Sequence, residues 1–83
     1  MPLNDEGYAH LTTHTAQLID KIMVAMQAQL KSSPERADYI RAAYRGQAVG
    51  AQVLWLEATE GLSHPQDAAN INEKVRAFYE AEK

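Results

Sequence analysis

Hydrophobic side chains recur every three or four positions along most of the chain, which is the spacing of α-helices. The pattern is interrupted at the N-terminus, at residues 32–34 and at residues 61–65, where Ser, Gly and Pro gather. Alternating β-branched runs and Asn-Gly or Asp-Gly turns do not occur in the sequence, so a β-sheet is not expected. The pattern predicts an all-α protein with a single domain over residues 1–83 and helices over residues 5–31, 34–61 and 65–81.

The first helix has a recognisable start. Asn4 or Asp5 can accept hydrogen bonds from the free N–H groups of the first turn, which is the role of an N-cap. With Asn4 as the cap, Leu3 and Tyr8 occupy the two positions of a hydrophobic staple. We therefore expect the helix to begin at residue 5, directly after its cap.

Similar signals mark both ends of the second helix. Ser33 is placed to cap it, and Pro34 occupies the first helical position, where its missing N–H costs nothing. Gly61 can adopt the left-handed conformation that commonly ends a helix. We expect the two long helices to form an antiparallel hairpin, with a shorter third helix, which starts near Ser63 and Pro65, lying on both.

Each long helix carries more apolar surface than a single helix contact covers. The second helix has one stripe that includes Ile40 and Trp55 and another made of small residues, and the first helix is apolar on two sides. A chain of 83 residues buries only about two-thirds of its surface, and it has no cysteine for a disulfide, so oligomerisation is the common remedy. We expect self-association through a surface made of Ala42, Gly46, Gly50, Val53, Met23 and Met26.

Two glycines inside the second helix carry most weight in this expectation. Each costs about 1 kcal/mol of helix stability relative to alanine. Together with Ala42, Gly46 and Gly50 form a flat ridge that lets another helix backbone approach closely. Two interpretations stay open, a tight contact with the first helix of the same chain and an interface between subunits. In both, Leu54 and Trp55 are expected to be buried.

A group of arginines and tyrosines is the candidate anion-binding site. Arg41 and Arg45 lie four residues apart, with Tyr44 beside them, and arginine forks next to aromatic rings suit phosphate recognition. The alternative is a solvated helix face with an ion pair between Asp38 and Arg41. In the first interpretation the ligand is an anion, which includes a nucleotide held between subunits. The formal net charge of −3 argues against general nucleic-acid binding.

Signals for a metal centre or an enzyme are weak. His10 and His14 lie four residues apart and could share a metal ion with His64, but the sequence supplies no further ligands, and two exposed histidines are the alternative. The sequence has no glycine-rich phosphate loop and no cysteine nucleophile. We therefore expect no catalytic residue, no metal and no cofactor, and a protein that is not an enzyme.

The sequence also indicates where in the cell the protein is located. No apolar run approaches the 18 residues that a membrane-spanning helix needs. The first residues are acidic and lack the apolar stretch of a signal peptide. These features predict a cytoplasmic protein without a membrane partner.

The chain resembles the small helical accessory proteins that phages encode, because it is short, free of cysteine and built as a helical hairpin whose second helix starts with proline. Some of those proteins are oligomers of helical hairpins that sequester cyclic nucleotides. Arg45, followed by a helix of small residues that ends in Leu54-Trp55, is similar to their hairpin. The resemblance implies an oligomer that acts by binding.

Three functions follow as hypotheses. The first is a self-associating interaction protein that binds a protein target, such as a host factor or a virion component. The second is an oligomer of hairpins that sequesters a nucleotide or another anionic small molecule. The third is a packaging or regulatory protein that binds DNA, which the net negative charge disfavours.

Overall fold

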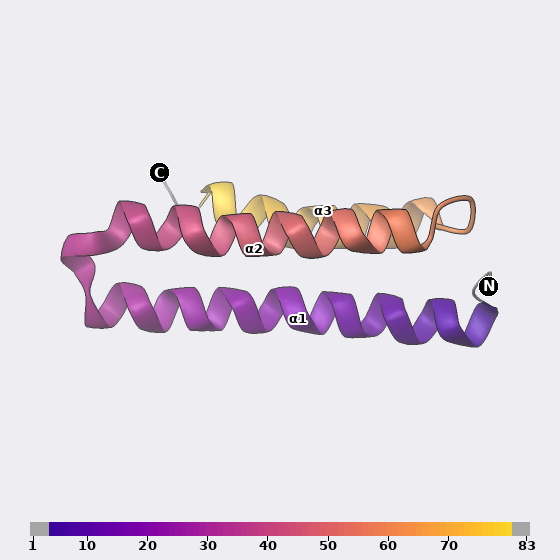
Figure 1. The fold of residues 1–83 in the computed structure, drawn as a ribbon, viewed down its shortest axis with the longest axis horizontal. Coiled ribbons are helices and arrows are strands. Elements are labelled where there is room, and N and C mark those ends of the chain that lie inside the picture. Colours follow the sequence, from indigo (N-terminus) through magenta and orange to yellow (C-terminus); the bar gives the residue numbers. More distant parts are fainter. Residues whose placement is uncertain (1–3, 81–83) are drawn as a thin grey trace.

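The computed structural model describes residues 4–80 as three α-helices joined by two short connections. Helix α1 spans Asp5–Ser32, a short 3-10 helix η1 spans Pro34–Arg36, α2 spans Ala37–Ala58, and α3 spans Pro65–Glu80. Helices α1 and α2 form an antiparallel hairpin, and α3 folds back along it from the open end (Figure 1). The described residues contain no strand, so the all-α prediction is confirmed.

The molecule is elongated because α1 runs its whole length. The longest dimension is 45 Å, close to the roughly 42 Å of a helix with the 28 residues of α1. Helix α3 has 16 residues and therefore covers only part of the hairpin. The end near η1 extends beyond α3 (Figure 1).

The helix ends agree in part with the sequence signals. The side chain of Asn4 accepts a hydrogen bond from the Gly7 backbone N–H at 2.6 Å, which confirms it as the cap of α1. Leu3, the expected staple partner of Tyr8, lies outside the described residues, as does residue 81 at the expected end of the third helix.

The structure differs from the sequence prediction at the connections between the helices. Ser33 precedes the second helical segment as expected, but its side chain makes no capping hydrogen bond, so that detail of the prediction is wrong. Its backbone N–H instead bonds the carbonyl of Gln29 and closes the end of α1. The segment from Pro34 begins as a 3-10 turn before α2 starts. Gly61 has φ +81°, the left-handed conformation expected of it, but α2 ends at Ala58 with Thr59 as its C-cap, three residues before the predicted end.

The core lies along the line where the three helices meet. The buried residues of each helix recur at helical spacings, such as the three and four positions that separate Ile19, Ile22 and Met26, so one face of each helix points inward. Trp55 is 1% exposed, which confirms its predicted burial. The buried hydrophobic residues are Tyr8, Ile19, Ile22, Met26, Ile40, Ala48, Trp55, Ile71, Val75 and Phe78.

A polar network ties the three helices together at the open end of the hairpin. The Tyr8 hydroxyl donates to Asp67 Oδ2 at 2.8 Å and accepts from the His64 backbone N–H at 3.0 Å. Nearby, Trp55 Nε1 donates to Thr12 Oγ1 at 2.9 Å. These bonds join α1 to the start of α3 and to the end of α2, so they fix where α3 turns back.

Replacing Tyr8 with phenylalanine is expected to lower the free energy of unfolding by about 1–3 kcal/mol, because Asp67 and the His64 N–H both lose a partner at a half-buried site. Urea unfolding followed by circular dichroism measures this. Tyr79→Phe is the matched control, since Tyr79 is exposed and its ring is kept, and it should change stability by less than about 0.5 kcal/mol. Equal effects of the two substitutions would contradict the role given to the Tyr8 hydroxyl.

Within residues 4–80, no helix is long and apolar enough to cross a membrane.

Candidate functional site

One side of α2 faces away from the other two helices. Gly46 and Trp55 are nine residues apart, which is two and a half helical turns, so they lie on opposite sides of α2. Trp55 points into the core, and the side around Gly46 therefore points outward. We call this side the α2 face; its members are all exposed and are Tyr39, Ala42, Ala43, Gly46, Gly50, Val53, Leu54 and Glu57.

The α2 face is apolar over most of its length. Tyr39 and Leu54 are 66% and 69% exposed, and Val53, between Gly50 and Leu54, is also exposed. Only Glu57, at one end, is charged. Residues 39–57 extend for about 28 Å at 1.5 Å per residue. The face is therefore an apolar strip with bulky side chains at both ends and small residues in the middle.

The two glycines have no role in the packing of this chain. A Cβ atom added to Gly46 or to Gly50 would meet no heavy atom within 4 Å. The interpretation of the ridge as a tight contact with the first helix is therefore wrong, because the stripe that contains Trp55 makes that contact. The interpretation as an interface between subunits remains a prediction.

Three residues lie elsewhere than predicted. Leu54 is on the surface rather than buried, because it lies roughly a quarter turn away from Trp55, on the outer side of α2. Met26 is 1% exposed and Met23 is half-buried against the core. Both methionines therefore pack within the chain, and Met26 has no surface to offer a second subunit.

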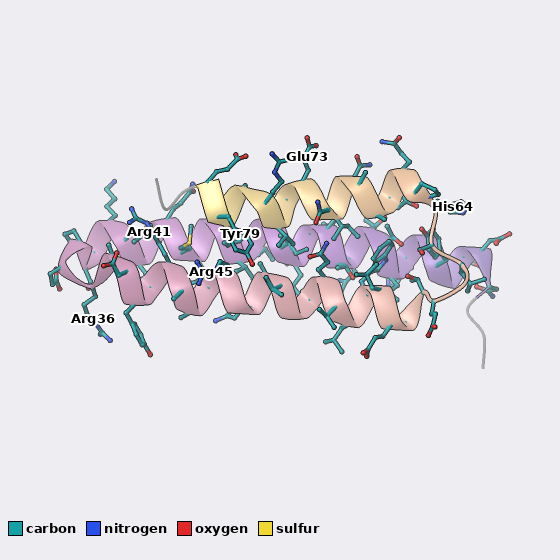
Figure 2. All side chains as sticks on the ribbon, turned by 90° about the horizontal axis from the view of Figure 1, so that it is seen from above. Arg36, Arg41, Arg45, His64, Glu73 and Tyr79 are labelled. Carbon is teal, nitrogen blue, oxygen red and sulfur yellow. The ribbon has the colours of Figure 1, made fainter. Side chains whose placement is uncertain are left out.

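The three predicted anion-binding residues do not share one site, because Arg41 and Arg45 line one hollow and Tyr44 lines another. The guanidinium of Arg45 stacks over the ring of Tyr79, 5.2 Å from its centre, in the last turn of α3 (Figure 2). Arg41 lies one turn earlier on α2, and its Nε is buried without a hydrogen-bond partner. Tyr44 instead lines a separate hollow, with Arg36 and Tyr39.

This placement gives Arg45 a structural role. The C-terminal end of α3 carries the negative end of a helix dipole and has no basic residue of its own in the last turn. Arg45, on the neighbouring helix, supplies a positive charge there. Asp38 lines the same hollow as Arg41 and Arg45 and would repel an anion. Among residues 4–80, the expected ion pair between Asp38 and Arg41 does not form.

The histidines also separate into two places. The rings of His10 and His14 stack with centres 6.4 Å apart on the exposed side of α1. His64 lies against the ring of the buried Tyr8, 5.2 Å between centres. The part of the chain that the structure describes holds no group of three residues able to share a metal ion.

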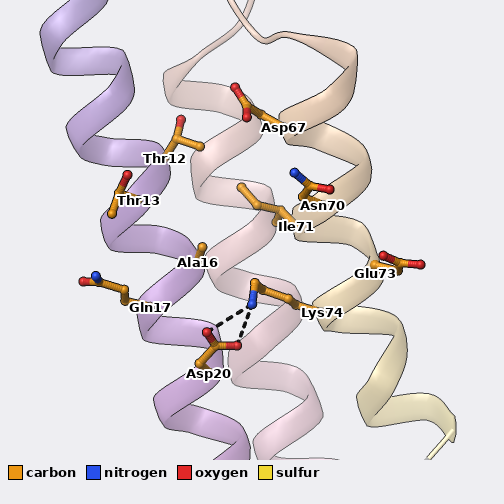
Figure 3. A pocket seen from close by; sticks show the side chains of 10 residues that line it. All are labelled: Thr12, Thr13, Ala16, Gln17, Asp20, Asp67, Asn70, Ile71, Glu73 and Lys74. Carbon is orange, nitrogen blue, oxygen red and sulfur yellow. Dashed lines mark hydrogen bonds and ion pairs between the residues drawn. The ribbon is translucent and has the colours of Figure 1, made fainter.

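A groove of about 700 Å³ runs between α1 and α3 (Figure 3). Its charged groups are largely engaged: Lys74 Nζ bonds Asp20 at 2.9 Å, and Asp67 accepts from Tyr8. No residue of α2 lines it, so the groove and the α2 face are separate surfaces. The residues lining the groove are Thr12, Thr13, Ala16, Gln17, Asp20, Asp67, Asn70, Ile71, Glu73 and Lys74.

Sequence reasoning missed four members of the α2 face, namely Tyr39, Ala43, Leu54 and Glu57. Leu54 was assigned to the core beside Trp55. A helical projection carries the missing signal, because Tyr39 lies seven residues before Gly46 and Leu54 lies four after Gly50. These spacings place Tyr39 and Leu54 on the same side of the helix as the two glycines.

Comparisons with protein-family models, with curated proteins and with solved structures gave no match to this chain.

Proposed function

We propose that the protein is a small helical binding protein, without enzymatic activity, that self-associates through the α2 face. The observation that carries this proposal is the pair of interior glycines, Gly46 and Gly50. They cost α2 about 2 kcal/mol together, and no contact within the described chain requires them. A close approach by another backbone is the physical reason that accounts for them.

The exposed apolar side chains also support self-association. Soluble monomers rarely expose contiguous apolar patches beyond a few hundred Å². Tyr39, Val53 and Leu54 lie on one strip about 28 Å long, with alanines and glycines between them. Burying this strip against a second copy removes the patch from water and adds core to a small domain, which is the usual remedy for a short chain.

Self-association leaves a second surface free for a target. The groove between α1 and α3 contains no residue of α2, so a copy bound at the α2 face does not cover it. An associated pair would then present two such grooves. This arrangement suits the function of an interaction protein that binds a protein target, and we propose the groove as the surface that meets it.

Replacing Leu54 with glutamate is expected to weaken self-association at least tenfold, because a charge would be buried in an apolar contact. Sedimentation equilibrium on the wild type and on the variant at micromolar concentration measures this. Val24→Glu is the matched control: Val24 is 66% exposed on α1, outside the α2 face, and should leave association unchanged. A wild type that sediments at 9.2 kDa over the whole range would contradict the proposal.

A further inference from the structure

The two halves of the α2 face differ in size and in charge. The half before Gly46 contains Ala42 and Ala43, and the half after Gly50 contains Val53 and Leu54. The positions next to the glycines are therefore small on one side and large and aliphatic on the other, while Tyr39 lies at the outer end of the first half. In a parallel copy alanine would face alanine and leucine would face leucine, so the two helices would be held apart at one end of the strip and left loosely packed at the other.

An antiparallel copy matches the face. A two-fold axis that passes between Gly46 and Gly50 brings each residue to the same height, along the helix axes, as the residue at the same distance on the other side of position 48. Gly46 then faces Gly50 of the second copy, which allows the backbones to approach. Ala42 and Val53 lie along one edge of the strip, and Ala43 and Leu54 lie along the other. The two-fold axis keeps each edge on the same side, so Ala42 lies against Val53 and Ala43 against Leu54 of the second copy, and each large side chain meets a small one.

The charges at the ends of the strip fit the same arrangement. Glu57 and Glu60 lie at the C-terminal end of α2, where the helix dipole disfavours negative charge and the last turn has no basic residue. Neither carboxylate forms an ion pair with another residue of the described chain. At the opposite end, the guanidinium of Arg36 stacks on Tyr39, 5.0 Å from the ring centre.

An antiparallel copy brings these two ends together. Tyr39 then faces Glu57 of the second copy, to which its hydroxyl can donate, and Arg36 lies at the same end of the strip as Glu57 and Glu60 of that copy. Glu35 and Asp38 are also at this end, so the favourable contacts are those of Arg36 and Tyr39 with the two carboxylates. A parallel copy would instead set Glu57 and Glu60 against themselves.

We infer that the partner at the α2 face is a second copy of this chain, in an antiparallel pair whose two-fold axis passes between Gly46 and Gly50. This inference rests on the proposed self-association and adds the direction and register of the pair. It also predicts which positions of the two copies lie within disulfide distance. Position 42 lies next to position 53 of the other copy, whereas it is about 18 Å along the axis from its own counterpart.

Disulfide cross-linking tests this geometry directly, because the natural chain has no cysteine. Ala42→Cys and Val53→Cys are prepared as single variants, one carrying a mass tag, and are oxidised alone and mixed. Both positions are exposed, so neither variant should disturb the fold. A disulfide requires Cα atoms about 4.4–6.8 Å apart. We expect a covalent heterodimer in the mixture and at least tenfold less covalent dimer from either variant alone.

The control pairs Ala42→Cys with Val24→Cys, an exposed valine of α1 that should give no specific cross-link. Efficient self-cross-linking of either single variant would overturn the antiparallel pair. So would the absence of the heterodimer in a sample that sediments as a dimer, and the proposed self-association would survive that result. A sample that sediments as a monomer overturns the self-association as well.

Discussion

Replacing Trp55 with alanine is expected to remove most of the stability of the fold. Trp55 is 1% exposed, and its indole nitrogen donates to Thr12 Oγ1 on α1. Truncating a buried Trp costs about 3–5 kcal/mol, whereas a domain of this size has about 4–12 kcal/mol in total. Thermal unfolding followed by circular dichroism should show a melting temperature at least about 12 °C lower.

The control for Trp55→Ala is Leu54→Ala, at the position directly before it. Leu54 is 69% exposed and belongs to the α2 face, so its loss should change the stability of a single chain by less than about 0.5 kcal/mol. The comparison is made at concentrations where both variants are monomeric. A melting temperature that falls equally for the two substitutions would show that the core and surface sides of α2 are misassigned.

The helices could be predicted from the sequence because their signals are local. Apolar periodicity, the Asn4 cap, Pro34 and Gly61 each act within a turn or two, and the observed bounds of α1 and α2 lie close to the predicted ones. The 3-10 start of the second segment was not predicted. Proline at a helix start fits both a 3-10 and an α-helical first turn, so the sequence does not distinguish them.

The position of α3 could not be predicted, because it depends on contacts between residues far apart in the chain. Tyr8 reaches Asp67 across 59 positions, and Lys74 reaches Asp20 across 54. None of these four residues belongs to a short motif that would predict its partner. Tyr79, which stacks on Arg45, was missed for the same reason.

The candidate interface was predicted in part. The excess of apolar stripes on the second helix correctly indicated a side left over from the core, and Ala42, Gly46, Gly50 and Val53 are all exposed there. The first helix misled the prediction. Met26 is buried in the core, and α1 packs against both α2 and α3, so part of the apolar width of the first helix serves contacts within the chain.

The glycines of α2 place chain stability and association in opposition. A residue with a side chain at position 46 or 50 would favour the helix, and the structure has room for it. In the antiparallel pair the same side chain would lie between two backbones. A substitution at either site should therefore change the two properties in opposite directions, which a glycine kept for packing within the chain would not do.

Gly50→Leu is expected to stabilise the single chain and to disrupt the pair. Helix propensity raises the free energy of unfolding by about 0.8 kcal/mol, since no atom of the chain lies within 4 Å of the added Cβ. Overpacking costs about 1–3 kcal/mol per site, and the two-fold axis counts it twice, so the association constant should fall at least about 30-fold. Urea unfolding at concentrations where the chain is monomeric measures the first effect, and sedimentation equilibrium measures the second. Ala28→Leu adds the same side chain to the exposed side of α1 and should leave association unchanged. A Gly50→Leu variant that associates as tightly as the wild type would place the contact between copies elsewhere on the molecule.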